Sequence, residues 1–136
     1  MKSLFFIAIG LILLACCDER SDNSPSINDD LQGKWILSHH LIDGENILVK
    51  FMWEYSELNF IKKGDVSGEI IWTTITDPQN SAIHDGDYEV VAFGDSIIFS
   101  NSYWDGRYSL KIMNDNIELS AILGSHTWVL RGDREE

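Results

Sequence analysis

From position 31 onward, apolar and polar residues alternate in short stretches, and each stretch ends at a turn signal. Leu58 and Phe60 stand two residues apart, as do Ile70 and Trp72. A period of two places such side chains on one face of a β-strand, whereas an amphipathic helix needs a period near 3.6. No window carries a helical stripe with caps, so the pattern predicts an all-β domain. The predicted strands cover residues 34–41, 55–62, 66–74, 87–92, 96–100, 107–113, 117–121 and 126–131.

Tight connections separate most of these strands. Asp43 and Gly44, like Gly64 and Asp65, are residue types that favour turns. A sheet of eight antiparallel strands has two unpaired edges unless it closes on itself. We therefore predict an eight-stranded antiparallel up-and-down barrel. Residues 46–53 are apolar without a pattern, and a short strand, a helical turn or a flap over one end of the barrel all fit them.

The first 15 residues have a different pattern, in which Lys2 precedes an apolar run over residues 4–14. Eleven helical residues reach only about half of a hydrocarbon core of roughly 30 Å, which argues against an uncleaved membrane anchor. A buried core helix is the other alternative. We predict a secretory signal peptide over residues 1–15. The run Leu13-Leu14-Ala15-Cys16 resembles the lipobox of bacterial lipoproteins, and this implies a lipidated Cys16 that attaches the chain to a membrane.

Residues 16–30 are rich in Ser, Asn and Asp, and Ile27 is their one strongly apolar side chain beyond the cysteines. Such a composition predicts a disordered acidic tether, with the barrel domain over residues 31–136. Asp18-Glu19 also resembles the surface-export signal of lipoproteins in the Bacteroides group. We expect the bacterial cell envelope, on either face of the outer membrane, with retention at the inner membrane as the alternative.

The domain has no cysteine, because Cys16 and Cys17 are the only two in the chain. A secreted domain without disulfides depends on its hydrophobic core, and roughly 120 residues are enough for one such core.

Gly33-Lys34-Trp35 at the start of the first strand, with Arg131 at the end of the last, resembles the calycin signature. Residues 31–131 as a whole are similar to small lipocalin-like lipoproteins of bacteria. The resemblance implies that the Trp35 indole packs under Arg131 and closes one end of the barrel. It also implies that the protein binds a small hydrophobic molecule inside.

A barrel of eight strands is just wide enough to be filled by side chains or to hold one small ligand. If it holds a ligand, the pocket is expected to measure roughly 300 to 1,000 Å³. The alternative is a packed barrel that acts through its loops as a protein-interaction or inhibitor module, with exposed aromatic clusters at 51–53 and 103–104. The candidate ligand-binding residues of the barrel interior are Trp35, Phe60, Trp72, Tyr88, Tyr108 and Trp128.

The formal charge is −12, and removal of residues 1–15 takes away only Lys2. Such an acidic protein is not expected to bind nucleic acid, whose phosphates attract basic surfaces. A basic protein or peptide, or a neutral lipophile, suits it better.

Catalytic and metal-binding motifs are absent from the sequence. His39 and His40 are adjacent on a predicted strand and so face opposite sides, which prevents both from joining one metal site easily. If His39 faces inward with Trp35 and Leu37, we expect it to be a core residue and not a metal ligand. The run from His84 to Asp87 lacks the dense oxygen spacing of a calcium loop. We expect no enzyme activity, no cofactor and no metal.

Overall fold

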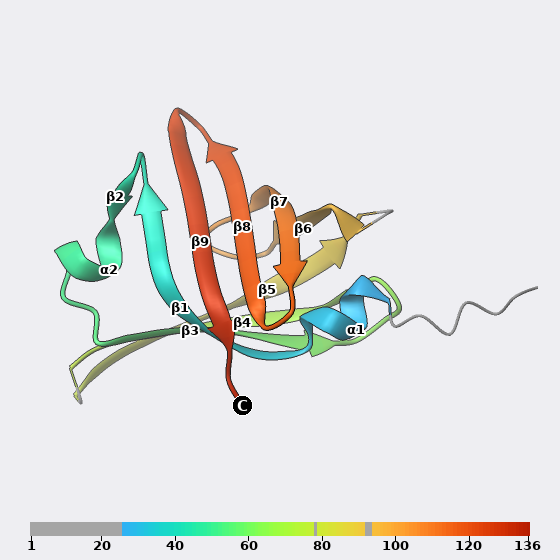
Figure 1. Ribbon diagram of the computed structural model, residues 1–136, viewed down its shortest axis with the longest axis horizontal. Helices are drawn as coiled ribbons and strands as arrows, with labels where there is room; N and C mark the ends of the chain where they lie inside the picture. Colours follow the sequence, from blue (N-terminus) through green and yellow to red (C-terminus); the bar gives the residue numbers. More distant parts are fainter. Residues whose placement is uncertain (1–25, 78, 92–93) are drawn as a thin grey trace, which may run out of the picture.

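The computed structural model describes residues 26–77, 79–91 and 94–136, and the predicted signal peptide, Cys16 and the first part of the tether lie outside these residues. Eight antiparallel strands close into a barrel through the pairing of β1 with β9, and one short strand, β2, is added to β1 (Figure 1). The predicted fold class is confirmed. The strands are β1 (Gly33–Ile42), β2 (Glu45–Asn46), β3 (Tyr55–Lys62), β4 (Ser67–Asp77), β5 (Asn80–Val90), β6 (Ser96–Ser100), β7 (Gly106–Met113), β8 (Asn116–Leu123) and β9 (His126–Arg134), and the helices are α1 (Ile27–Leu31) and α2 (Ile47–Lys50).

The two ends of the barrel carry different elements. In this meander, successive connections alternate between ends, so the β3–β4 and β5–β6 connections share one end with α1. We call this the closed end. The β1–β3 connection with α2, the β4–β5 turn and the β6–β7 turn lie at the opposite end, which we call the open end (Figure 1).

Helix α1 belongs to the domain, so the prediction of a disordered tether up to Asp30 is wrong for residues 26–30. Ser26 and Asp29 form a capping box at its start. The Asn28 side chain is buried and donates hydrogen bonds to the carbonyl oxygens of Gly64 at 2.9 Å and Asp65 at 3.1 Å. Composition alone predicts that these polar residues are solvated. It cannot reveal that Asn28 is buried, because the carbonyl groups that accept its hydrogen bonds belong to a turn more than 30 residues away.

The closed half of the barrel is filled by side chains. The Phe60 ring lies 5.3 Å from the Tyr88 ring in an edge-on arrangement, and Phe99 lies 5.1 Å from Tyr108. The Tyr88 hydroxyl donates to the Asn28 side-chain oxygen at 2.7 Å, which connects this core to α1. Aromatic rings packed edge to face are a favourable core arrangement, and here they are part of the buried hydrophobic core.

The β4–β5 hairpin is longer than predicted. Strand β5 begins at Asn80, whereas the sequence pattern begins a strand at residue 87. Residues 80–85 are exposed, so they carry no alternation of buried and exposed positions that a sequence reading could detect. Within the described ranges, no helix is long and apolar enough to cross a membrane.

Candidate functional site

A pocket of about 360 Å³ lies at the open end of the barrel and opens to solvent on one side. Its floor is formed by Trp72 and Trp104, whose rings meet edge to face at 4.5 Å. The Trp72 indole nitrogen donates to the Ser56 hydroxyl at 2.8 Å, so its polar atom is satisfied. Four of the five tryptophans of the chain line the pocket, and its full lining is His40, Ile42, Ile47, Phe51, Trp53, Trp72, Thr74, Ala82, His84, Tyr103, Trp104 and Trp128.

Helix α2 forms one wall of this open-end pocket, and Asn46 fixes its position. The Asn46 side-chain oxygen accepts hydrogen bonds from the backbone nitrogens of Leu48 and His40, both at 3.2 Å. One residue therefore caps α2 and joins it to β1. After the helix, the Trp53 backbone nitrogen donates to the Leu48 carbonyl at 2.9 Å, and the Trp53 and Phe51 rings stack at 6.1 Å.

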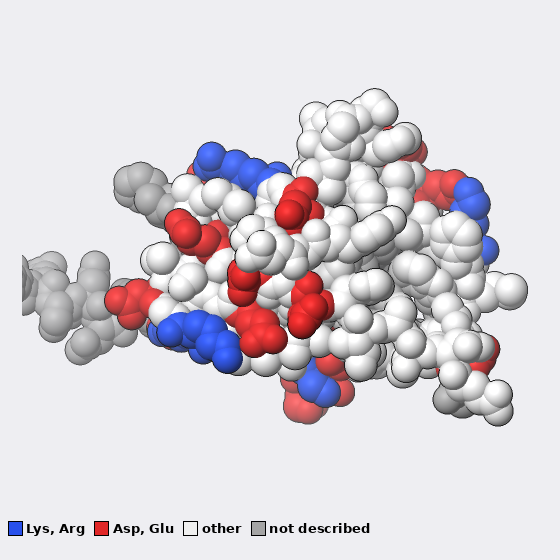
Figure 2. Space-filling view, turned by 180° about the vertical axis from the view of Figure 1, so that it is seen from behind, with Lys and Arg blue, Asp and Glu red and all other residues white. Residues whose placement is uncertain are grey.

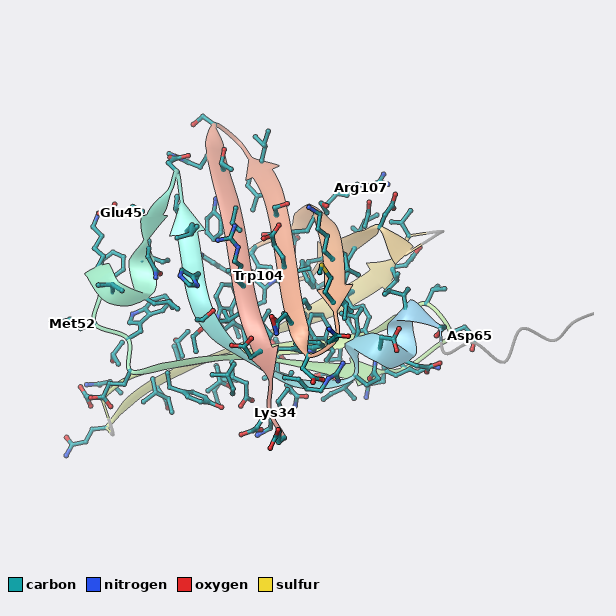
Figure 3. The ribbon with its side chains drawn as sticks, in the orientation of Figure 1. Lys34, Glu45, Met52, Asp65, Trp104 and Arg107 are labelled. Carbon is teal, nitrogen blue, oxygen red and sulfur yellow. The ribbon has the colours of Figure 1, made fainter. Side chains whose placement is uncertain are left out.

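The β6–β7 turn forms the opposite wall. Asp105 accepts hydrogen bonds from the backbone nitrogen and the hydroxyl of Ser102, and the Tyr108 hydroxyl donates to the Trp104 carbonyl at 3.1 Å. These bonds fix the turn that carries Trp104, which is labelled in Figure 3 and has only 3% of its surface exposed. The neighbouring Tyr103 is 84% exposed and stacks on His84 at 6.0 Å at the pocket mouth.

His40 is the most unusual residue of the lining. It is 3% exposed, and neither ring nitrogen has a hydrogen-bond partner in the part of the chain that the structure describes. Its ring lies 5.1 Å from Trp72 and 5.2 Å from Trp128. Burial among these rings lowers the pKa of His40 to about 4, because the imidazolium would lose its hydration. The side chain is therefore neutral at pH 7.

A β-bulge explains why His40, and not His39, faces inward. The pairing of β1 with β9 shifts register between Leu37 and His39. Trp35 and Leu37 are buried before the bulge, whereas His40 is buried after it and His39 is exposed. The extra residue reverses the parity of the strand, which a strict period of two cannot anticipate.

The predicted interior residues divide between the two halves of the barrel. Trp72 and Trp128 line the open-end pocket. The other four predicted residues belong instead to the packed core of the closed half, where each is almost completely buried: Trp35, Phe60, Tyr88 and Tyr108.

The basic residue over Trp35 is Arg134, in place of the expected Arg131. The Arg134 guanidinium lies 4.2 Å from the centre of the Trp35 ring, and the two residues are paired across β1 and β9. Arg131 pairs with His39 on the outer face and contacts Glu118 at 2.7 Å. Strand β9 continues three residues beyond the predicted end, and this extension brings Arg134 to the closed end.

The clusters at 51–53 and 103–104 were expected as possible exposed surfaces. Phe51, Met52 and Tyr103 are exposed, whereas Trp53 and Trp104 turn into the lining of the pocket. The predicted order of the strands already indicated that these two clusters lie at the same end of the barrel. In an eight-stranded meander the first, third and fifth connections lie at one end, so the two clusters and the turn near His84 had to meet there.

No group of three His, Cys, Asp or Glu side chains that could hold a metal ion occurs among the described residues.

Asp85, Asp87 and Glu89 alternate along the exposed face of β5, with Glu69 paired to Asp87. Figure 2, which views the molecule from behind, shows acidic side chains gathered over the middle of that face. Among the described residues that line the pocket, none is a carboxylate, a cysteine or a lysine.

No family model, curated protein or solved structure matches this chain. The geometry of the barrel and its open-end pocket is therefore the basis for inferring function.

Proposed function

We propose that the domain binds one small, mainly apolar molecule in the open-end pocket. The observation that carries the proposal is the buried, unpartnered His40 beside Trp72 and Trp128 in that pocket. A buried polar group without a partner costs about 1 to 3 kcal/mol, and a ligand with one hydrogen-bonding group would remove that cost. A mostly apolar pocket with few polar groups is the usual form of a small-molecule site.

The relationship to lipocalin-like proteins is part of this proposal. It is supported by the closed eight-stranded barrel and by the Gly33-x-Trp35 start, with Arg134 packed over Trp35. Attachment to the cell envelope through Cys16 is supported by the sequence pattern of residues 1–16, and residence at the outer membrane by the acidic pair Asp18-Glu19. Release of the protein into the soluble fraction by Cys16→Ser would support the anchor, and unchanged membrane attachment of that variant would contradict it.

The binding proposal is tested on the full chain, purified from the envelope and held in lipid nanodiscs. Calorimetric titration with a neutral apolar probe, 3-(2-naphthyl)propan-1-ol, is expected to show one site after subtraction of empty nanodiscs. Trp53→Ala should weaken binding about tenfold or more, because a large aromatic side chain contributes about 1.5 to 3 kcal/mol of burial. Ile122→Ala, a change at a residue that is exposed and outside the lining, should leave binding unchanged. Absence of saturable binding would contradict the proposal.

A second candidate function is protein binding at the open end. Val49, Phe51 and Met52 follow one another closely at α2 and are 74%, 54% and 79% exposed. Met52 lies on the outer side of this segment in Figure 3. Apolar residues grouped on a surface are typical of contact sites. A Val49→Asp and Met52→Asp double variant that loses an envelope partner but still binds the naphthyl probe would support this second function.

A further inference from the structure

Six aromatic side chains besides the two histidines line the open-end pocket: Phe51, Trp53, Trp72, Tyr103, Trp104 and Trp128. Trp53, Trp72 and Trp128 surround the His40 ring, with ring centres between 5.1 and 6.2 Å from it. The Trp104 ring meets the Trp72 ring edge to face at 4.5 Å, and the exposed Tyr103 stands at the mouth of the pocket. The face of an aromatic ring carries partial negative charge, and groups of such rings are the usual binding sites of organic ammonium ions.

The polar atoms of the pocket also favour a cation. His40 is neutral, because burial lowers its pKa to about 4. A neutral imidazole has one nitrogen that accepts a hydrogen bond, and in His40 neither nitrogen has a partner within the described residues. Of the described residues that line the pocket, none is a lysine or an arginine. The positive charge nearest in sequence is that of Lys50, which lies 5.9 Å from the centre of the Phe51 ring and pairs with Glu45, so an anionic ligand such as a fatty acid would find no unpaired positive charge beside Phe51.

The charged residues beside the lining positions are mostly acidic. Asp43, Glu54, Asp85 and Asp105 each directly follow a lining residue in the chain, whereas Phe51 is preceded by Lys50. Lys50 contacts Glu45 at 2.8 Å, so its charge is compensated. Together with the formal charge of −12, this distribution attracts cations to the open end and repels anions.

We propose that the open-end pocket selects an organic ammonium ion that carries an apolar or aromatic tail, with its N–H group donated to the imidazole of His40. This inference rests on the proposed function and specifies its ligand class. The tryptophan faces hold the charged head and the tail, and the acidic flanks raise the local concentration of cations.

The test uses three probes that share a naphthyl group and a chain of three carbons and differ in the polar group at its end. These are 3-(2-naphthyl)propan-1-amine, which is a cation at pH 7, the neutral 3-(2-naphthyl)propan-1-ol, and the anionic 3-(2-naphthyl)propanoate. Each is titrated calorimetrically into the full chain in zwitterionic nanodiscs, with empty nanodiscs as the blank. We expect the ammonium probe to bind about tenfold tighter than the alcohol, and the carboxylate to bind most weakly.

Two variants identify the residues responsible. His40→Leu should remove most of the preference for the ammonium probe over the alcohol, whereas His39→Leu, on the exposed face of the same strand, should preserve it. Asp85→Asn, an exposed change that does not depend on the core, should weaken ammonium binding about two- to fourfold without affecting the alcohol. Glu89→Gln, farther along the same exposed face, is its matched control and should have a smaller effect.

The possible failures are distinguishable. If the alcohol or the carboxylate binds as tightly as the ammonium probe, the cation inference is overturned and the binding function stands. If His40→Leu keeps the full preference for the ammonium probe over the alcohol, the proposed hydrogen bond to His40 is overturned as well. If none of the three probes binds, both the inference and the proposed binding function are contradicted.

Discussion

The guanidinium of Arg134 lies over the indole of Trp35 at 4.2 Å and donates to the carbonyl oxygen of Gln32 at 2.7 Å. A second nitrogen of Arg134 donates to the carbonyl oxygen of Asp30. The last strand, the first strand and the C-terminal end of α1 therefore meet at one side chain. Because Trp35 is completely buried beneath it, Arg134 covers the core at the closed end.

Arg134→Ala is expected to lower the free energy of unfolding by about 2 kcal/mol, because it removes a cation–π contact and leaves two carbonyl oxygens without their donor. Arg131→Ala should change it by less than about 1 kcal/mol, because Arg131 forms an exposed ion pair with Glu118. Urea unfolding of both variants measures the difference. Equal losses would contradict the assignment of the covering role to Arg134.

The polar network of α1 predicts a second stability effect. Asn28→Ala removes the two donors to the β3–β4 turn and the acceptor for the Tyr88 hydroxyl, at a cost of about 2 to 3 kcal/mol. Asp30→Ala, which replaces an exposed side chain of the same helix, is its control. A chain that starts at Gly33 should be less stable than one that starts at Ser26 by at least as much as Asn28→Ala. Equal thermal midpoints of the two truncated chains would show that α1 is not part of the folded domain.

His40 predicts a pH dependence of stability. Its pKa is lowered to about 4 in the folded protein from an ordinary value of about 6.5. Between these values the unfolded chain binds a proton that the folded chain does not. The contribution of neutral His40 to the free energy of unfolding is therefore complete above pH 6.5. Up to about 3 kcal/mol of that free energy is lost as the pH falls through 4.

Unfolding free energies measured from pH 7 to pH 4 should fall less steeply in His40→Leu than in the wild type. His39→Leu should keep the wild-type slope in this comparison. Parallel curves for the wild type and His40→Leu would mean that His40 titrates normally and is not held neutral by burial. A constant offset in stability between variants does not affect this comparison, because only the slope is interpreted.

Gly68 on β4 is expected to tolerate no side chain. A Cβ atom at this position would lie 2.2 Å from the Ile61 carbonyl oxygen and 2.6 Å from the Tyr88 ring. Gly68→Ala should destabilise the fold by about 3 kcal/mol or more, because the backbone at Ile61 would have to move to make room for the methyl group. Gly44→Ala, where φ is +84° and no atom lies within 4 Å, should cost only about 1 kcal/mol. Similar losses in thermal denaturation for the two variants would contradict this account.

Alternation along the chain predicted the barrel well, because strands such as β4 bury every second side chain from Gly68 to Thr74. It failed where that pattern is absent or interrupted. Residues 80–85 are exposed and show no period, and the bulge in β1 reverses which histidine faces inward. Helix α1 was missed because its stability depends on partners at a distant turn.

The pocket was predicted only in part for a similar reason. Trp72 and Trp128 stand on strands and follow the period, so they could be assigned to the interior. Trp53 and Trp104 are on connections, where the direction of a side chain depends on local bonds such as that from the Trp53 nitrogen to Leu48. Topology could have placed both at the same end, but not inside the pocket.

The position of α1 determines where a tether to a membrane anchor would join the domain. The described chain enters the barrel at Ser26 beside the closed end, opposite the mouth of the pocket (Figure 1). The ten residues 16–25 span at most about 35 Å when fully extended, which is close to the diameter of a small domain. With a lipid on Cys16, the tether would join the domain at the sealed base of the barrel. The aromatic mouth would then lie at the end of the barrel farthest from this attachment, where it is open to dissolved molecules.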